Sequence, residues 1–192
     1  NSYGSLGYAR RLKIELEPTQ PYVLLRHVRF ATADALADAM TAIAGSREFE
    51  GRRVDFLDGT VFSPSEQYLS IGAMVDRLPD SVPVSDYTGM GIYYRSIQAK
   101  PLDALTIHDY LWRWDTDWFW CSRAFGAQNP VIRRLWPRRY RRSSVYWKLI
   151  ALDQRFGIAD RIEAWRGRPP RERVVQDIEV PLHRCVEFLD WF

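Results

Sequence analysis

The chain has 192 residues, of which 46% are hydrophobic and 14% aromatic, and a net charge of only +3. This composition excludes a disordered chain, and the length suits one domain with a full core. No apolar run reaches the length of a membrane-spanning helix, and we expect no signal peptide. Two cysteines and three histidines without metal-ligand spacing predict no disulfide framework and no metal site, so we expect a reducing, cytoplasmic compartment.

The first twenty residues combine a glycine-rich turn with an alternating segment. The turn is Gly4-Ser5-Leu6-Gly7, where glycines would let the backbone approach a ligand closely. Apolar Leu12, Ile14 and Leu16 then alternate with charged residues up to Pro18, as in a half-buried strand. Because the chain enters this strand directly and ends at Phe192 inside an amphipathic pattern, we expect a longer protein at both ends.

The next segment is predicted to contain three strands, a helix and an extended piece. The predicted elements are strands at 22–30, 53–57 and 67–73, a helix from Thr32 to Ala44 stopped by Gly45, and an extended segment at 92–97. Asp58-Gly59 is predicted to be a turn, and residues 63–65 a loop.

Helices dominate the prediction for the rest of the chain. We expect helices at 105–125, 143–156 and 159–165, with Asp103 or Thr106 capping the first and Asn129-Pro130 ending it. A linker at 166–173, a strand at 173–180 and a closing helix from Pro181 follow. The whole pattern predicts an α+β fold, a ferredoxin-like antiparallel sheet with a long helical insertion.

Residues 108–147 are the most unusual part of the sequence, since they hold six of the eight tryptophans. Tyr110, Trp114 and Trp118 recur at helical spacing, which is more often typical of core packing than of a ligand site. Residues 131–148 carry seven basic residues and no acid. Such a run is usually a solvated face, but with interleaved aromatic residues it also suits a membrane surface or an anionic ligand.

Four stretches of the sequence form an ordered set of motifs. They are a GSLG turn at Gly4 to Gly7, a Tyr/Arg/Phe-Trp pattern at Tyr110, Arg113, Phe119 and Trp120, an Asn-Pro pair at Asn129-Pro130, and a VVQD-x-x-VP motif at Val174 to Asp177 with Val180-Pro181. Taken in this order, the motifs resemble those of the FAD-linked sterol delta-24 reductase (Diminuto-like) family, a group of vanillyl-alcohol-oxidase type flavoproteins. The resemblance covers nearly the whole sequence. The sequence departs from the family at Trp112, Trp114, Asp115 and Asp117 and in its heavier arginine tract, which leaves the substrate less defined than the chemistry.

The resemblance implies an FAD-dependent oxidoreductase that reduces or oxidises a C–C bond of a sterol or isoprenoid-like lipid. It assigns residues 1–20 to the terminal strand of an FAD-binding domain whose remainder is missing here, and residues 21–192 to a substrate (cap) domain truncated at its C-terminus. Such an enzyme uses FAD, with NADPH as a candidate electron donor. This fragment alone is expected to be inactive.

The resemblance also implies roles for individual residues. Asp177 and Tyr110 are the candidate catalytic acids, because reduction of a carbon–carbon double bond needs a proton beside the flavin hydride. The flavin-binding candidates are Gly4, Ser5, Leu6 and Gly7. The substrate-binding candidates are Arg113, Trp120, Asn129 and Gln176.

The same residues could also have purely structural roles. Asp177 and Glu179 on an alternating strand are more often solvent-facing, and Arg113 pairing with Asp117 on one helix would be purely structural. Peripheral membrane contact through Arg133–Trp147 is a further candidate, with no nucleic acid expected in the leading hypothesis. The alternative function is a non-catalytic basic α+β module that binds a membrane surface or nucleic acid, and a third is an inactive relic.

Overall fold

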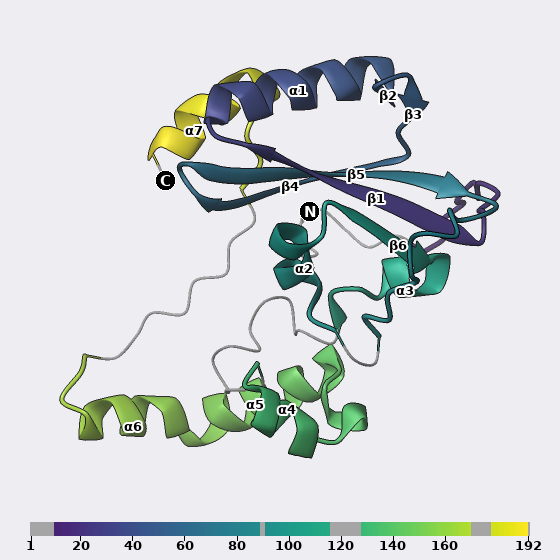
Figure 1. Cartoon of the computed structure of the whole chain (residues 1–192). Coiled ribbons are helices and arrows are strands. Elements are labelled where there is room, and N and C mark those ends of the chain that lie inside the picture. The colour runs from purple at the N-terminus through teal and green to yellow at the C-terminus, as the bar shows by residue number, and fades with distance from the viewer. Residues whose placement is uncertain (1–9, 89–90, 116–127, 170–177, 192) are drawn as a thin grey trace.

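The computed structural model describes residues 10–88, 91–115, 128–169 and 178–191, and Figure 1 shows the course of the backbone. Its centre is a four-stranded antiparallel sheet made of β1 (Tyr22–Phe30), β4 (Phe56–Ser63), β5 (Glu66–Val75) and β6 (Leu102–Thr106). The strand order is β4-β5-β1-β6. The predicted α+β class is therefore confirmed.

Helices and short elements surround this sheet. The helices are α1 (Ala33–Ser46), α2 (Tyr93–Ala99), α3 (Ile107–Leu111), α4 (Pro130–Leu135), α5 (Ser143–Phe156), α6 (Ile158–Trp165) and α7 (Cys185–Trp191). Two 3-10 turns, η3 (Arg138–Tyr140) and η4 (Leu182–Arg184), and a small hairpin of β2 (Glu48–Phe49) and β3 (Arg52–Arg53), complete the described elements. No helix in these described ranges is long and apolar enough to cross a bilayer.

The sheet has a hydrophobic cluster on each face. The elements follow one another in the order β1-α1-β4-β5-α2-β6. α1 and α7 cover one face of the sheet, while α2 and α3 cover the other (Figure 1). The ferredoxin-like detail stays a prediction. Leu36 and Ile43 of α1 pack with Leu69 and Ile71 of β5. On the other face Val23 and Leu25 pack with Tyr93, Ile97 and Tyr110. Because strand side chains alternate, both faces of β1 and β5 are covered.

Several predicted elements are confirmed. β1 spans the predicted strand at 22–30, and β5 contains the one at 67–73. Thr32 caps α1, since its hydroxyl accepts a hydrogen bond from the Ala35 N–H at 3.3 Å. α5 and α6 lie where they were predicted, and Gly157 separates them with a positive φ of 58°. These elements are specified by local signals, caps and an αL glycine, which a sequence displays directly.

Three predictions about the middle of the chain are wrong. Asp58-Gly59 is not a turn but lies inside β4, paired with Ser70 and Leu69. The segment at 92–97 is not extended, because α2 starts at Tyr93 and buries Tyr93, Ser96 and Ile97 at helical spacing. Gly45 does not stop α1, which runs on to Ser46 and ends at Arg47 in the left-handed conformation.

The long helix predicted at 105–125 is confirmed only from Ile107 to Leu111 within its described part, with Thr106, one of the two predicted caps, as its N-cap. Residues 102–106 pair with β1 as the edge strand β6, in which Leu105 lies opposite Val23. A helix begins only after the Thr106 cap, whose hydroxyl accepts from the Asp109 N–H, and it ends at Leu111. Pairing with β1 thus overrides the helical spacing of the apolar residues.

The strand predicted before Pro18 is absent from residues 10–20, which form no helix or strand. Leu12, Ile14 and Leu16 are 73%, 67% and 89% exposed. Most of the strand predicted at 173–180 lies outside the described residues, and residues 178–180 form no strand. The closing helix is present as η4 followed by α7, with Pro181 preceding η4 as its N-cap.

Candidate functional site: a polar layer under α2 and α3

A row of polar residues crosses the face of the sheet that α2 and α3 cover. Ser70 of β5 lies opposite Asp58 of β4 on one side and His27 of β1 on the other. His27 and Ser70 are buried, and the His27 Nδ1 lies 2.8 Å from the Ser70 hydroxyl. Buried polar groups in a sheet of apolar neighbours cost free energy unless they are paired, so this row needs partners from the covering layer.

Arg113, just after α3, supplies the main partner. Its guanidinium donates to the Asp58 carboxylate at 2.7 Å and to the Tyr110 carbonyl at 2.7 Å. It also stacks 4.0 Å above the Tyr110 ring and lies 5.1 Å from the Tyr93 ring centroid. The planar cation is thus held by one carboxylate, one carbonyl and two aromatic faces, a geometry that a lysine could not reproduce.

Three polar atoms in this layer are buried without a hydrogen-bond partner in the structure: His27 Nε2, the Tyr93 hydroxyl and Arg113 Nε. Burial lowers the pKa of His27 to about 4, while nearby Asp103 opposes and Lys100 and Arg113 add to the shift. His27 is therefore neutral at pH 7 and a weak base. The Asp58, Ser70 and His27 row is no catalytic triad, since Asp58 pairs with Arg113 and Ser70 is 1% exposed.

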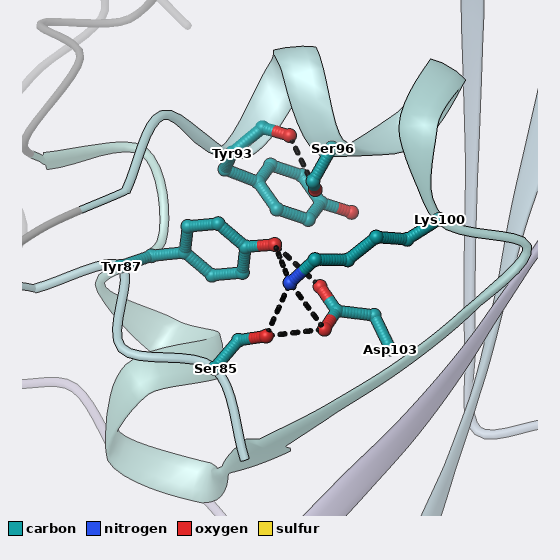
Figure 2. A network of polar contacts seen from close by, with 6 residues as sticks. All are labelled: Ser85, Tyr87, Tyr93, Ser96, Lys100 and Asp103. Carbon is teal, nitrogen blue, oxygen red and sulfur yellow. Dashed lines mark hydrogen bonds and ion pairs between the residues drawn. The ribbon is translucent and has the colours of Figure 1, made fainter. Parts of the chain in front are cut away.

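A second polar cluster lies beside the first, at β6 (Figure 2). The buried Asp103 carboxylate accepts hydrogen bonds from the Ser85 hydroxyl at 2.5 Å and the Tyr87 hydroxyl at 2.6 Å. Lys100 Nζ donates to the Ser85 hydroxyl at 2.7 Å and pairs with Asp103 at 3.3 Å. These bonds tie the segment before α2 to the edge strand of the sheet.

The phenols of the layer are poor acids. Burial raises the pKa of Tyr93 to about 12. Burial also raises the pKa of Tyr110 and of Tyr87, and in Tyr87 the hydrogen bond to Asp103 adds to the rise. The layer therefore holds two carboxylates and two cations in fixed positions among protonated phenols. It can orient a polar group, but none of these phenols is ready to give up a proton at neutral pH.

Of the site residues predicted from the sequence, the structure brings Tyr110 and Arg113 together. Arg113 pairs with Asp58, 55 positions away in the sequence. Asp117, the other partner predicted for it, lies outside the described residues. Asn129 lies elsewhere, as the N-cap of α4, where its Oδ1 accepts from the Val131 and Ile132 N–H groups. Its side chain thus has a structural role.

The remaining predicted site residues lie outside the described residues. They are the flavin-binding candidates Gly4, Ser5, Leu6 and Gly7, the catalytic candidate Asp177, and the substrate-binding candidates Trp120 and Gln176.

Sequence reasoning misses most of the polar layer. It does not mark His27, Ser70, Tyr93 or Asp103 as site residues, although His27 follows Val23 and Leu25 on one face of a predicted strand. A histidine at such an inward position is a detectable signal. Asp58 and Asp103 cannot be found in this way, because the sequence predicts a turn at one and a helix cap at the other.

A groove with a volume of about 390 Å³ opens at the outer side of α3. Its lining mixes polar and apolar surface and comprises Thr88, His108, Trp112, Asp115, Arg142 and Ser144. Asp115 joins its two walls, because its carboxylate accepts from the Ser143 N–H at 3.2 Å. Trp112 is the only large aromatic side chain among these lining residues.

The described residues contain no group of three or more His, Cys, Asp or Glu that could hold a metal ion. No protein-family model, curated protein or solved structure was found to match the sequence.

Proposed function

We propose that this protein is the substrate-side domain of an FAD-dependent oxidoreductase that reduces or oxidises a C–C bond of a sterol or isoprenoid-like lipid. The support from the sequence is the ordered set of stretches that resemble the sterol delta-24 reductases, which runs from Gly4 to Pro181. The proposal includes a cytoplasmic location, in line with only two cysteines in the sequence.

One structural observation carries the proposal furthest. Residues 10–20 have the alternating pattern of a strand, yet they pair with nothing in the described sheet, and Leu12, Ile14 and Leu16 are exposed. A row of three alternating apolar side chains is expected to lie against a core. The proposal assigns that core to an FAD-binding domain, of which residues 1–20 form the terminal strand.

The chemistry divides between the cofactor and the protein. When bound, FAD would supply the hydride chemistry, with NADPH as the candidate donor. The residues expected to approach it, Gly4 to Gly7, lie outside the described residues. For proton transfer, the raised pKa of Tyr110 makes it the weaker acid, and Asp177 remains the preferred candidate. Arg113, already held by Asp58, is better suited to positioning α3 than to contacting substrate.

The segment at 10–20 offers the test. In the protein that carries the flavin domain, Leu12→Asp with Leu16→Asp should release flavin, because two charges would enter the interface between the domains. The readouts are the yellow absorbance of the purified protein and its turnover of a sterol that has a double bond in its alkyl tail. In the 192-residue protein the same variant should unfold at the same urea concentration as the wild type, since both side chains are exposed.

Arg11→Asp with Lys13→Asp is the matched control, because these residues alternate with the apolar ones and should tolerate the change. Stable one-to-one flavin binding by the 192-residue protein would contradict the division into domains. If a longer protein that extends these 192 residues at both ends bound no flavin, the oxidoreductase proposal would be refuted and the non-catalytic module favoured.

A further inference from the structure

The charge of the protein is strongly segregated. Residues 131–168 hold eleven basic and three acidic residues, a net charge of +8, whereas the remaining residues have a net charge of −5. This segment contains α4, α5 and α6, which form a group set apart from the sheet on the side of α2 and α3 (Figure 1). The small net charge of the protein is therefore the sum of a strongly basic segment, which we call the basic unit (residues 131–168), and an acidic remainder.

Not all of these cations are available to a partner. Arg133 donates to the Gly91 carbonyl at 2.6 Å, and buried Arg141 donates to the Trp136 and Arg133 carbonyls. These two residues hold α4 and the start of α5 in place. Two of the arginines on which the predicted membrane contact through Arg133–Trp147 depends are therefore already engaged within the protein.

The other exposed cations are spread along the segment, at Arg134, Arg139, Arg142 and Lys148 and around α6. Ile158, Ile162 and Trp165 lie at i, i+4 and i+7, so they share one helix face, which we call the α6 stripe. All three are exposed, Trp165 by 86%, and Phe156 at the end of α5 is exposed beside them. Arg155, Arg161, Arg166 and Arg168 are exposed in the same stretch of sequence. Arg166 and Arg168 each lie 3.8 Å from the Glu163 carboxylate in an ion pair.

We propose that the α6 stripe docks onto an anionic phospholipid bilayer surface. A short helix with an apolar face, a tryptophan and flanking arginines lies in the plane of the head groups, with its apolar face in the acyl boundary and its cations on the phosphates. This inference is independent of the flavin proposal, because it depends only on residues 131–168.

The charge decides between this occupant and two others. A second copy packed symmetrically would bring another basic unit of +8 against the first, whereas an anionic bilayer neutralises it. A contact with the acidic part of a second copy is tested below as self-association. Nucleic acid would also attract the arginines, but two isoleucines offer a phosphate backbone neither hydrogen bonds nor stacking. Only the bilayer uses both the cations and the stripe.

The test compares two variants of the protein with two matched controls. The stripe variant is Ile162→Ser with Trp165→Ser, and the charge variant is Arg155→Ser, Arg161→Ser and Arg168→Ser. Their controls change equally exposed residues elsewhere: Leu111→Ser with Trp191→Ser, and Arg52→Ser, Arg77→Ser and Arg95→Ser. Far-ultraviolet circular dichroism establishes that all four remain folded, as the exposed positions predict.

Binding is measured by co-sedimentation with phosphatidylcholine vesicles that contain or lack phosphatidylserine. We expect binding only to the anionic vesicles, weaker in higher salt. The charge variant should bind about 100-fold more weakly, as three surface cations predict, and the stripe variant at least about tenfold more weakly, while both controls bind normally.

Three results would overturn the proposal. One is no binding to anionic vesicles, or equal losses in variants and controls. Another is salt-sensitive binding to duplex DNA that the stripe variant leaves unchanged. The last is self-association of the protein that the stripe variant abolishes, which would assign the stripe to a second copy.

Discussion

His27 is a neutral histidine buried against a serine, and this makes the stability of the protein depend on pH. Its pKa is about 4 in the folded state, against 6.5 for an ordinary histidine. Above pH 6.5 both states are neutral and the full stability is present. As the pH falls from 6.5 towards 4, only the unfolded state takes up the proton, so folding stability is lost.

We therefore expect the free energy of unfolding to fall by about 2 kcal/mol between pH 7 and pH 5 because of His27 alone. Urea titrations at both pH values measure this loss. The His27→Gln variant should not show the loss, even if the substitution itself changes the stability of the protein. The matched control is His108→Gln at an exposed position, which should keep the loss. A pH dependence unchanged in His27→Gln would show that His27 is not held neutral by burial.

Arg113 shows what can and cannot be predicted at the scale of single residues. Its importance is predicted from a pattern that resembles one in a flavoprotein family, and the structure buries Arg113 beside Tyr110. Its partner Asp58 is 55 residues away, at a position where the sequence predicts a turn. Local patterns identify single residues of unusual type. A contact between residues that are distant in the sequence can be predicted only when the alignment of the strands in the sheet is known.

At the scale of elements, the cluster around Asp103 fastens one loop. Ser85 and Tyr87 belong to the segment that leads from β5 to α2, and both hydroxyls donate to Asp103 on β6. Removing one hydrogen bond to a buried carboxylate costs about 2 kcal/mol. The loop should therefore open more readily than the sheet when the cluster is weakened.

Tyr87→Phe is the variant that isolates this effect. Amide hydrogen exchange should quicken at Ser85, whose N–H donates to the Ala104 carbonyl at 2.8 Å, while β1 and β5 keep their protection. Tyr94→Phe is the matched control, because that phenol bonds Gln128 outside the cluster. Equal exchange at Ser85 in the wild type and in Tyr87→Phe would mean that other contacts fix the loop.

The elements also show why part of the fold escapes prediction. Helices with a cap or a C-terminal glycine, such as α1 and α5, are predicted within a few residues. The sequence predicts a helix from Leu105, inside β6, because the apolar and small residues there fit either period, and only pairing with β1 decides between them. The opposite error occurs at α2, where tyrosines and an isoleucine, which favour strands, lead the sequence to predict an extended segment instead of a helix.

At the scale of the whole molecule, the helical group of α4, α5 and α6 differs from the sheet in how little it buries. None of these three helices has a buried side chain, whereas β1 and β5 are covered on both faces. Burial of apolar surface is the main source of stability, so the helical group should open at a lower free energy than the sheet.

Native-state hydrogen exchange in increasing urea would reveal this difference. We expect the amides of α5 and α6 to exchange through an opening well below the global unfolding free energy, and those of Leu25 and Leu69 only through global unfolding. Anionic vesicles should slow exchange in α6 if the bilayer covers its stripe. A single exchange free energy throughout the described residues would contradict a division into two cooperative units.

The loop fastened by Asp103 also covers an edge of the sheet. Val84 forms a parallel bridge with Ala104, and the Ser85 N–H bonds the outward carbonyl of the same residue, so the free side of β6 is occupied. The other edge, β4, carries a register irregularity between Val61 and Ser63. Open edges recruit strands from neighbouring molecules, and a bulge or a covering loop prevents this. A substitution of Tyr87 or Asp103 that loosens this loop would therefore first cause the protein to precipitate at high concentration, at temperatures well below its melting temperature.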